Sequence, residues 1–210
     1  MRIFLTVCVL LACFPSVCRA DALDDLASRL DGFSGDRNVS ASFVQTRHLR
    51  ELGMDVKFTG SMLCEYRGRL RWQIDSPLHS VTVISDSGLV HYDAAAKRIS
   101  KIAARDFPWM KVLRECFSDW IGGDVRRLAA GKKFDLSVPA DRTLRLVPRT
   151  ARHNEFFRSV SITFVPDYSA VALVRIEEPS GDTLEIVFSG IRKNRDIPAS
   201  AWELPPKCTL

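Results

Sequence analysis

The chain has 210 residues, of which 46% are apolar and 26% charged, with a formal net charge of +5 at pH 7. This composition supplies enough apolar side chains for a sizeable core and excludes a disordered chain. The basic residues are scattered rather than clustered, which excludes a nucleic-acid-binding tail. A chain of this length is compatible with one domain.

The first 20 residues have the pattern of a secretory signal peptide. Arg2 precedes an apolar run over residues 3–14, and the segment ends at Cys18-Arg19-Ala20. This arrangement predicts cleavage after Ala20 and export of a mature single domain covering residues 21–210. The apolar run is too short to cross a bilayer, which takes about 20 residues.

An alternative reading of the same segment involves lipid attachment. Leu10-Leu11-Ala12-Cys13 is similar to the cleavage box of bacterial lipoproteins, with Cys13 as the residue that would carry the lipid. In that case the protein would be anchored to a membrane. Simple cleavage is the favoured interpretation, and the alternative stays open.

Beyond residue 20, the sequence contains three cysteines, Cys64, Cys116 and Cys208. An odd number permits at most one intramolecular disulfide, and the sequence leaves open whether Cys64 and Cys116 form it. A small disulfide-stabilised scaffold is excluded because a chain of this length does not need one.

The predicted mature chain opens with an amphipathic helix and continues as a long series of strands. Leu23, Leu26, Leu30 and Phe33 recur at helical spacing behind an acidic first turn, which the helix dipole favours. Alternating apolar and polar residues between turn signals then predict strands over 39–48, 55–65, 69–75, 80–85, 89–93, 98–103, 133–138, 142–147, 156–165, 170–177 and 183–189. No strand–helix–strand rhythm occurs, so we expect an antiparallel sheet.

The strand over residues 69–75 carries the clearest alternation. Leu70, Trp72 and Ile74 form an apolar face, whereas Arg69 and Arg71 lie on the polar one. Such a face is ordinarily core, and composition alone does not separate a filled core from a cavity that holds an apolar ligand.

One segment interrupts the strands with a helical pattern. Trp109, Leu113, Phe117 and Trp120 recur at helical spacing after Pro108, which suits a first helical turn. The pattern predicts one or two short helices between residues 107 and 130. The tail beyond residue 190 is expected to lie against the sheet edge.

No catalytic or metal-binding constellation is visible in the sequence. The four histidines are isolated, with no ligand at metal-binding spacing. Neither a nucleophile elbow nor a phosphate-binding loop occurs. We therefore expect no metal, no cofactor and no enzymatic activity.

Four segments, in order, resemble the periplasmic lipoprotein carrier family, LolA and its relatives. They are the end of the first helix at Ser28-Arg29-Leu30-Asp31, then Ala41-Ser42-Phe43-Val44-Gln45, then Gly68-Arg69-Leu70-Arg71-Trp72 with Pro77, and finally residues 86–93 ending in Tyr92-Asp93. The similarity covers most of residues 23–100.

The resemblance implies a mainly β fold with covering helices, in which an open, curved antiparallel sheet forms an incomplete barrel under a helical lid. It implies a hollow that holds the acyl chains of a lipoprotein, or a related lipid, in the periplasm. The expected lining is Phe43, Phe58, Met62, Leu70, Trp72 and Ile74, and the expected lid residues are Leu30, Trp109, Leu113, Phe117 and Trp120. The implied partners are acylated lipoproteins, an inner-membrane release machinery and an outer-membrane acceptor, with the carrier a monomer.

The sequence departs from the family at one position of expected importance. The family often has Arg-Pro before the glycine, and that arginine bonds the lid, whereas this chain has Tyr66-Arg67. Arg67 is one place off and would face the other way in an unshifted strand. Tyr66, through its hydroxyl, and Arg67, through a bulge, are the two gating candidates.

Three other functions stay open from the sequence. A lipid on Cys13 would make the protein an outer-membrane-anchored acceptor of the same fold. A simply packed sheet would make it an envelope interaction module that binds no lipid, and an enzyme acting on lipid ranks third because no nucleophile with a base can be named.

Overall fold

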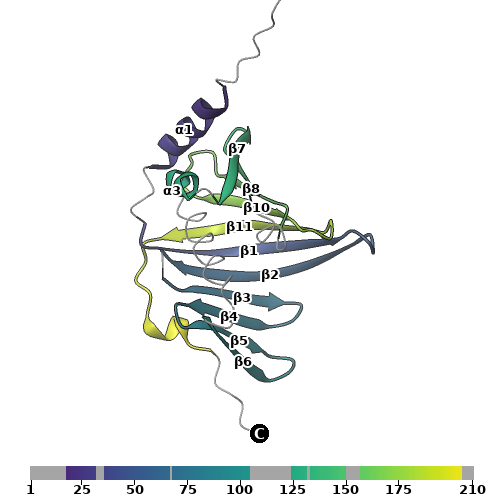
Figure 1. Ribbon diagram of the computed structural model, residues 1–210. Coiled ribbons are helices and arrows are strands. Elements are labelled where there is room, and N and C mark those ends of the chain that lie inside the picture. The colour runs from purple at the N-terminus through teal and green to yellow at the C-terminus, as the bar shows by residue number, and fades with distance from the viewer. Residues whose placement is uncertain are drawn as a thin grey trace, which may run out of the picture.

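One sheet of eleven antiparallel strands organises the computed structural model (Figure 1). The structure describes residues 18–31, 36–66, 68–104, 124–131, 133–149 and 157–204. The strands are β1 (Asn38–Leu49), β2 (Met54–Glu65), β3 (Leu70–Ser76), β4 (Ser80–Ser85), β5 (Gly88–Asp93), β6 (Arg98–Ala103), β7 (Phe134–Ala140), β8 (Thr143–Pro148), β9 (Ser159–Phe164), β10 (Val171–Glu177) and β11 (Thr183–Lys193). The helices are α1 (Cys18–Leu30), α3 (Val125–Ala130) and the 3₁₀ helix η3 (Ala199–Trp202).

The sheet is open, as expected. Its strand order is β6-β5-β4-β3-β2-β1-β11-β10-β9-β8-β7, so β6 and β7 are its two edges. Two meanders therefore meet where β1 pairs with β11, the chain's first and last strands. The expected strands are found within a few residues of their predicted bounds, except that β11 continues past the predicted end at Ser189 to Lys193.

The two faces of the sheet have different character. We call the face that carries Phe43, Met62 and Leu70 the inner face, because these side chains are buried together with residues of α1 and α3. The opposite, outer face carries Ser40, Ser42 and their cross-strand partners. Residues of β1 alternate between the two faces, as period-two spacing requires.

The helices α1 and α3 lie on the inner side at one end of the sheet. Each contacts β7 and the other helix, and α3 lies in front of the upper strands in Figure 1. α1 begins at Cys18, so the predicted cleavage would remove its first residues and leave the part from Asp21. The predicted lid residues Trp109, Leu113, Phe117 and Trp120 lie outside the described residues.

The expected position of the tail is wrong. The segment containing η3 packs on the outer face rather than against a sheet edge, since Trp202 is buried against Val81 and Val83. Arg71 fixes this segment by donating hydrogen bonds to the carbonyl oxygens of Ala201 (3.2 Å) and Glu203 (2.7 Å). The guanidinium of Arg69 lies 4.3 Å from the centroid of the Trp202 ring.

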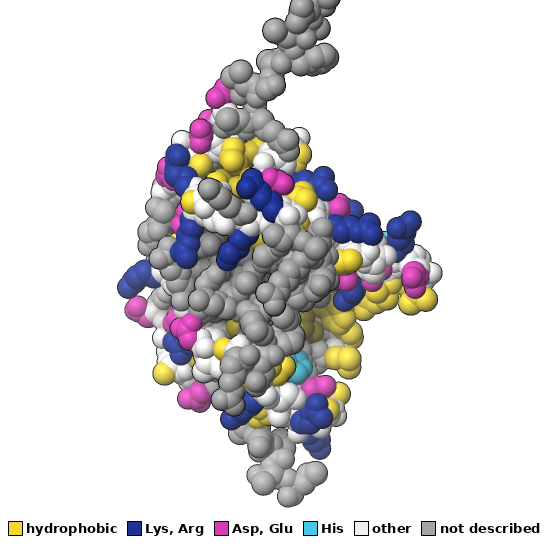
Figure 2. Space-filling model, in the orientation of Figure 1, with side chains coloured by type: hydrophobic (Ala, Val, Ile, Leu, Met, Phe, Trp, Pro, Cys, Tyr) yellow, Lys and Arg dark blue, Asp and Glu magenta, His cyan; other side chains and the backbone are white. Residues whose placement is uncertain are grey.

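The β1–β2 hairpin extends beyond its neighbour β3, which pairs with β2 only from Thr59 onward. Its tip projects at the right of Figures 1 and 2, where apolar side chains gather at the surface. Leu52 is 67% exposed and Met54 is 54% exposed there.

No helix in the described part of the chain is long and apolar enough to span a membrane.

Candidate functional site

An aromatic cluster lies at the centre of the inner face. The rings of Phe43 and Trp72 stack with centroids 4.0 Å apart, and Phe188 meets the edge of Trp72 at 6.4 Å. Phe43 is in β1 and Trp72 in β3, so the stack passes over the intervening strand β2. Phe188 pairs directly with Phe43 on the other side.

Gly60 of β2 makes this stack possible. It pairs with Phe43, and a β-carbon at Gly60 would lie 2.7 Å from Cζ of the Phe43 ring and 2.0 Å from the carbonyl oxygen of Gln73. Side chains are essentially never that close, so only glycine fits beneath the ring. The alternation of apolar and polar residues along β2 gives no signal for this role of Gly60.

The predicted lining residues share one face, with different degrees of burial. Phe43, Met62 and Leu70 are buried core residues. Trp72 and Ile74 are partly buried and pack against that core, whereas Phe58 is partly buried nearer the hairpin tip. The structure thus brings the six side chains to one surface, and their role in holding a lipid stays a prediction.

The core beside this surface is tightly packed. A hollow bordered by Met62, Phe188 and Ile191 has a volume of about 10 Å³, which is room for about one water molecule. An acyl chain would enter this part of the core only if the packed elements separated.

Leu30 and α3 contribute the covering side chains that the structure describes. Leu30 is 2% exposed and packs in the core with Leu26 and Ala27 of α1 and with Val125 and Leu128 of α3. At the surface, Arg126 of α3 pairs with Asp31 at 3.1 Å and donates a hydrogen bond to the Ser28 hydroxyl. Such exposed pairs stabilise a contact only weakly. The covering therefore depends mainly on the apolar contacts.

Tyr66 links the β2–β3 connection to α3. Its hydroxyl donates a hydrogen bond to Oδ2 of Asp124 (3.1 Å), and Oδ1 of the same carboxylate accepts from the Arg127 backbone N–H (3.1 Å). Asp124 is therefore the N-cap of α3. Arg67, the other gating candidate, lies outside the described residues.

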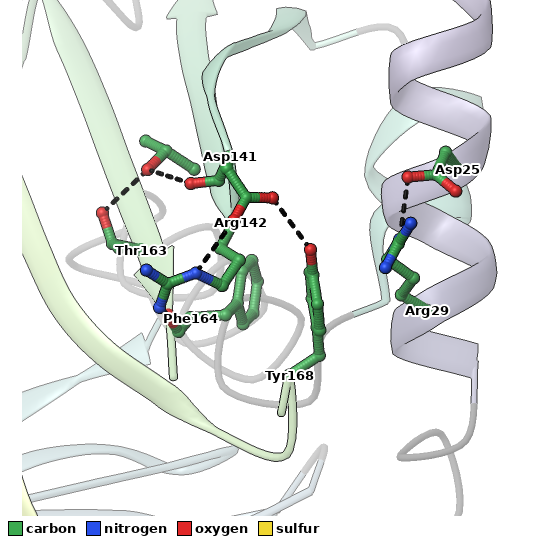
Figure 3. A network of polar contacts seen from close by, with 8 residues as sticks. Asp25, Arg29, Asp141, Arg142, Thr163, Phe164 and Tyr168 are labelled. Atoms are coloured by element: carbon green, nitrogen blue, oxygen red, sulfur yellow. Dashed lines mark hydrogen bonds and ion pairs between the residues drawn. The ribbon is translucent and has the colours of Figure 1, made fainter. Parts of the chain in front are cut away.

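A second polar network holds the C-terminal end of α1 (Figure 3). Arg29 is paired with Asp25 at 2.8 Å, and its guanidinium lies 5.3 Å from the centroid of the Tyr168 ring. The Tyr168 hydroxyl donates to Asp141 at 3.0 Å. This hydrogen bond, with the nearby Arg142, lowers the pKa of Asp141, whereas desolvation and the Asp141 carboxylate raise the pKa of Tyr168.

The described residues offer no sign of redox or metal chemistry. Cys64 is a free, buried thiol whose pKa is raised to about 12 by desolvation and, to a smaller extent, by Glu65. A thiol with this pKa is almost entirely protonated at neutral pH and therefore a poor nucleophile. No group of three or more metal-ligating side chains occurs in the described ranges.

Comparison with known proteins gives one family match. The family described as outer membrane lipoprotein carrier protein LolA matches residues 35–204. No curated protein sequence matches the chain.

Solved structures align with most of the chain at low identity. An uncharacterised conserved protein from Thermus thermophilus aligns with a TM-score of 0.50 and 10% identity, covering 89% of this chain and 96% of that one. A DUF1329 family protein from Desulfovibrio piger has a TM-score of 0.49 and 13% identity, covering 87% and 96%. The LolA superfamily protein NE2245 from Nitrosomonas europaea has a TM-score of 0.43 and 8% identity, covering 87% and 97%.

Proposed function

The chain belongs to the LolA family of outer membrane lipoprotein carrier proteins, and we propose that it binds the acyl chains of lipoproteins, or of a related lipid, and carries them across the periplasm toward the outer membrane without catalysis. The observation that carries this proposal is the continuous apolar inner face centred on Phe43, Met62 and Trp72, which shares one core with residues of α1 and α3. Its proposed partners are the acylated cargo, a release machinery at the inner membrane and an acceptor at the outer membrane.

The energetics of the cargo explain why such a face is needed. Each CH₂ group left in water costs about 0.8 kcal/mol, so an acyl chain of about 15 such groups would cost roughly 12 kcal/mol. A carrier must therefore replace water along the whole chain. The inner face supplies apolar surface of this kind, provided that the covering elements move away from it.

The proposed moving element is α3. α3 is short, with Val125 and Leu128 as its buried residues, and the Tyr66–Asp124 hydrogen bond connects its N-terminus to the sheet. In this proposal Tyr66 performs the closing role that an arginine has in the family. Breaking one hydrogen bond of this kind costs about 1 kcal/mol, which adds a small term to the burial of Val125 and Leu128 that holds α3 in place.

The test is displacement of a fluorescent fatty acid by a triacylated lipopeptide from purified protein that begins at Asp21. We expect saturable uptake, and we expect Phe58→Glu, on the inner face, to weaken it at least tenfold. Val44→Glu is the matched control, because Val44 is 44% exposed on the outer face of the same hairpin. Circular dichroism establishes that both variants are folded.

The alternatives give different results in the same experiments. Folded protein that takes up neither the fatty acid nor the lipopeptide would overturn the proposal in favour of an interaction module. Mass spectrometry of the native N-terminus distinguishes a soluble carrier, which begins at Asp21, from an anchored acceptor, which begins at a lipidated Cys13.

A further inference from the structure

The outer face of the sheet carries a groove lined by several serines and arginines. It has a volume of about 490 Å³ and lies between the central strands and η3. Its walls are Ser40, Ala41, Ser42, Ser61, Met62, Leu63, Arg71, Gly190, Arg192, Ser200 and Ala201. Among the residues that the structure describes, the set includes four serines and two arginines, and no acidic residue.

Strand register places the groove's functional side chains in two adjacent rows. Arg192 of β11 pairs with Ser40 of β1, Ser40 pairs with Leu63 of β2, and Leu63 pairs with Arg71 of β3. Directly paired residues point to the same face of the sheet. Arg192 and Arg71 therefore lie at the two ends of one row of side chains. The neighbouring row contains the pair Ser42 and Ser61.

A bulge in β11 turns Arg192 toward the groove. Ser42 pairs with Ser189 but Ser40 pairs with Arg192, so β11 has one extra residue at this point. Gly190 has a φ of +59°, the left-handed conformation that glycine adopts without strain at such bulges. Because of the extra residue, Ile191 packs against the core and Arg192 lies on the outer face.

Arg192 and the four serines of the groove are available to a ligand, whereas Arg71 is partly occupied by its hydrogen bonds to the C-terminal segment. In the part of the chain that the structure describes, the side chains of Arg192 and of the four serines make no hydrogen bond or ion pair with other residues. Arg71 donates only to neutral acceptors, namely the carbonyls of Ala201 and Glu203 and the side-chain oxygen of Gln73. Burial lowers the pKa of Arg71.

We infer that this groove binds the phosphate group of an organic phosphate, with Arg192 and Arg71 supplying charge and Ser40, Ser42, Ser61 and Ser200 supplying hydroxyl donors. Guanidinium groups and hydroxyls together are the donors that phosphate oxygens accept from. Two guanidiniums and four hydroxyls exceed what the two oxygens of a carboxylate can use. The volume exceeds that of an inorganic phosphate and leaves room for a glycerol-sized group attached to it.

The experiment is an NMR titration of isotope-labelled protein with sn-glycerol 3-phosphate, using glycerol as the phosphate-free control. We expect saturable amide shifts at Ser40, Ser61 and Arg192 with the phosphate compound alone. Arg192→Glu should weaken binding at least tenfold. Arg98→Glu makes the same charge change at an exposed position on the edge strand β6, and should leave affinity within twofold.

The double variant Ser42→Ala/Ser61→Ala tests the hydroxyls separately from the charge and should weaken binding several-fold. Equal shifts with glycerol, the absence of saturation, or equal weakening by Arg192→Glu and Arg98→Glu would each overturn the inference.

Vesicle flotation distinguishes the two sources of an organic phosphate. Phosphatidylglycerol vesicles that bind the wild type but not Arg192→Glu, with glycerol 3-phosphate as competitor, would identify a lipid headgroup. Binding of glycerol 3-phosphate without vesicle binding would identify a soluble phosphate. This site is on the opposite face from the proposed acyl-binding surface. Measuring fatty-acid uptake by Arg192→Glu therefore tests the carrier function separately from the phosphate site.

Discussion

The ring of Phe43 stacks on that of Trp72 at 4.0 Å although their strands are separated by β2. The intervening position is Gly60, which has no side chain to keep the rings apart. This contact joins the hairpin of β1 and β2 to β3 on the inner face, and the predicted lipid-binding surface is built around it.

The first prediction concerns Gly60. Gly60→Ala should lower the free energy of unfolding by about 1–3 kcal/mol or more, because its β-carbon would overlap the Phe43 ring and the Gln73 carbonyl. Urea unfolding measures the change. Gly53→Ala is the comparison, because Gly53 has a φ of +59° but open space around it, and should cost only about 1 kcal/mol. Equal losses would show that crowding at Gly60 is not the cause.

The second prediction concerns the hydrogen bond between Tyr66 and Asp124. Tyr66→Phe should lower stability by about 0.5–1.5 kcal/mol, because it removes the hydrogen bond to Asp124 and leaves the ring in place. Asp124→Ala should cost more, about 1–2 kcal/mol, since it also removes the N-cap of α3. A double-mutant cycle isolates the pair. If the two single effects were additive, the proposed coupling would be absent.

If Tyr66 holds the cover closed, the same substitution also changes kinetics. We expect faster amide hydrogen exchange in α3 and faster uptake of a fluorescent fatty acid in Tyr66→Phe than in the wild type. Unchanged exchange and uptake would show that the hydrogen bond stabilises the fold without controlling access.

The third prediction concerns the C-terminal segment. Trp202 is 9% exposed against Val81 and Val83, so Trp202→Ala should destabilise the protein by about 3–5 kcal/mol. Leu52→Ala, at the exposed hairpin tip, should change stability by less than about 0.5 kcal/mol. A small effect of Trp202→Ala would mean that the segment is not part of the folded unit.

The fourth prediction concerns pH. The pKa of Cys64 rises from 9.0 to about 12 on folding, so above about pH 9 the unfolded chain loses a proton that the folded protein keeps. Stability should therefore fall as pH rises from about 9 to about 12, by up to about 1.4 kcal/mol per pH unit. Urea unfolding of wild type and Cys64→Ala at pH 8 and pH 10 gives the difference. Parallel pH dependences would contradict the predicted contribution of Cys64.

The strands and the two faces of the sheet could be predicted from the sequence because side-chain alternation is local. Leu70, Trp72 and Ile74 share a face by spacing alone, and the structure finds all three packed in or against the core. Residues 1–17, with Cys13 among them, and the predicted lid residues from Trp109 to Trp120 are outside the described part of the chain. The signal peptide, the lipid attachment and the lid therefore stay predictions.

Only the tertiary structure decided which residues meet across long separations in the chain. Tyr66 and Asp124 are 58 positions apart, and nothing in either local pattern connects them. The predicted β11 ended at Ser189, whereas a bulge at Gly190 continues the strand and exchanges the faces of Ile191 and Arg192. A one-residue bulge reverses the alternation of side chains between the two faces of the sheet. Strand pairing, which depends on the whole fold, determines where the bulge lies.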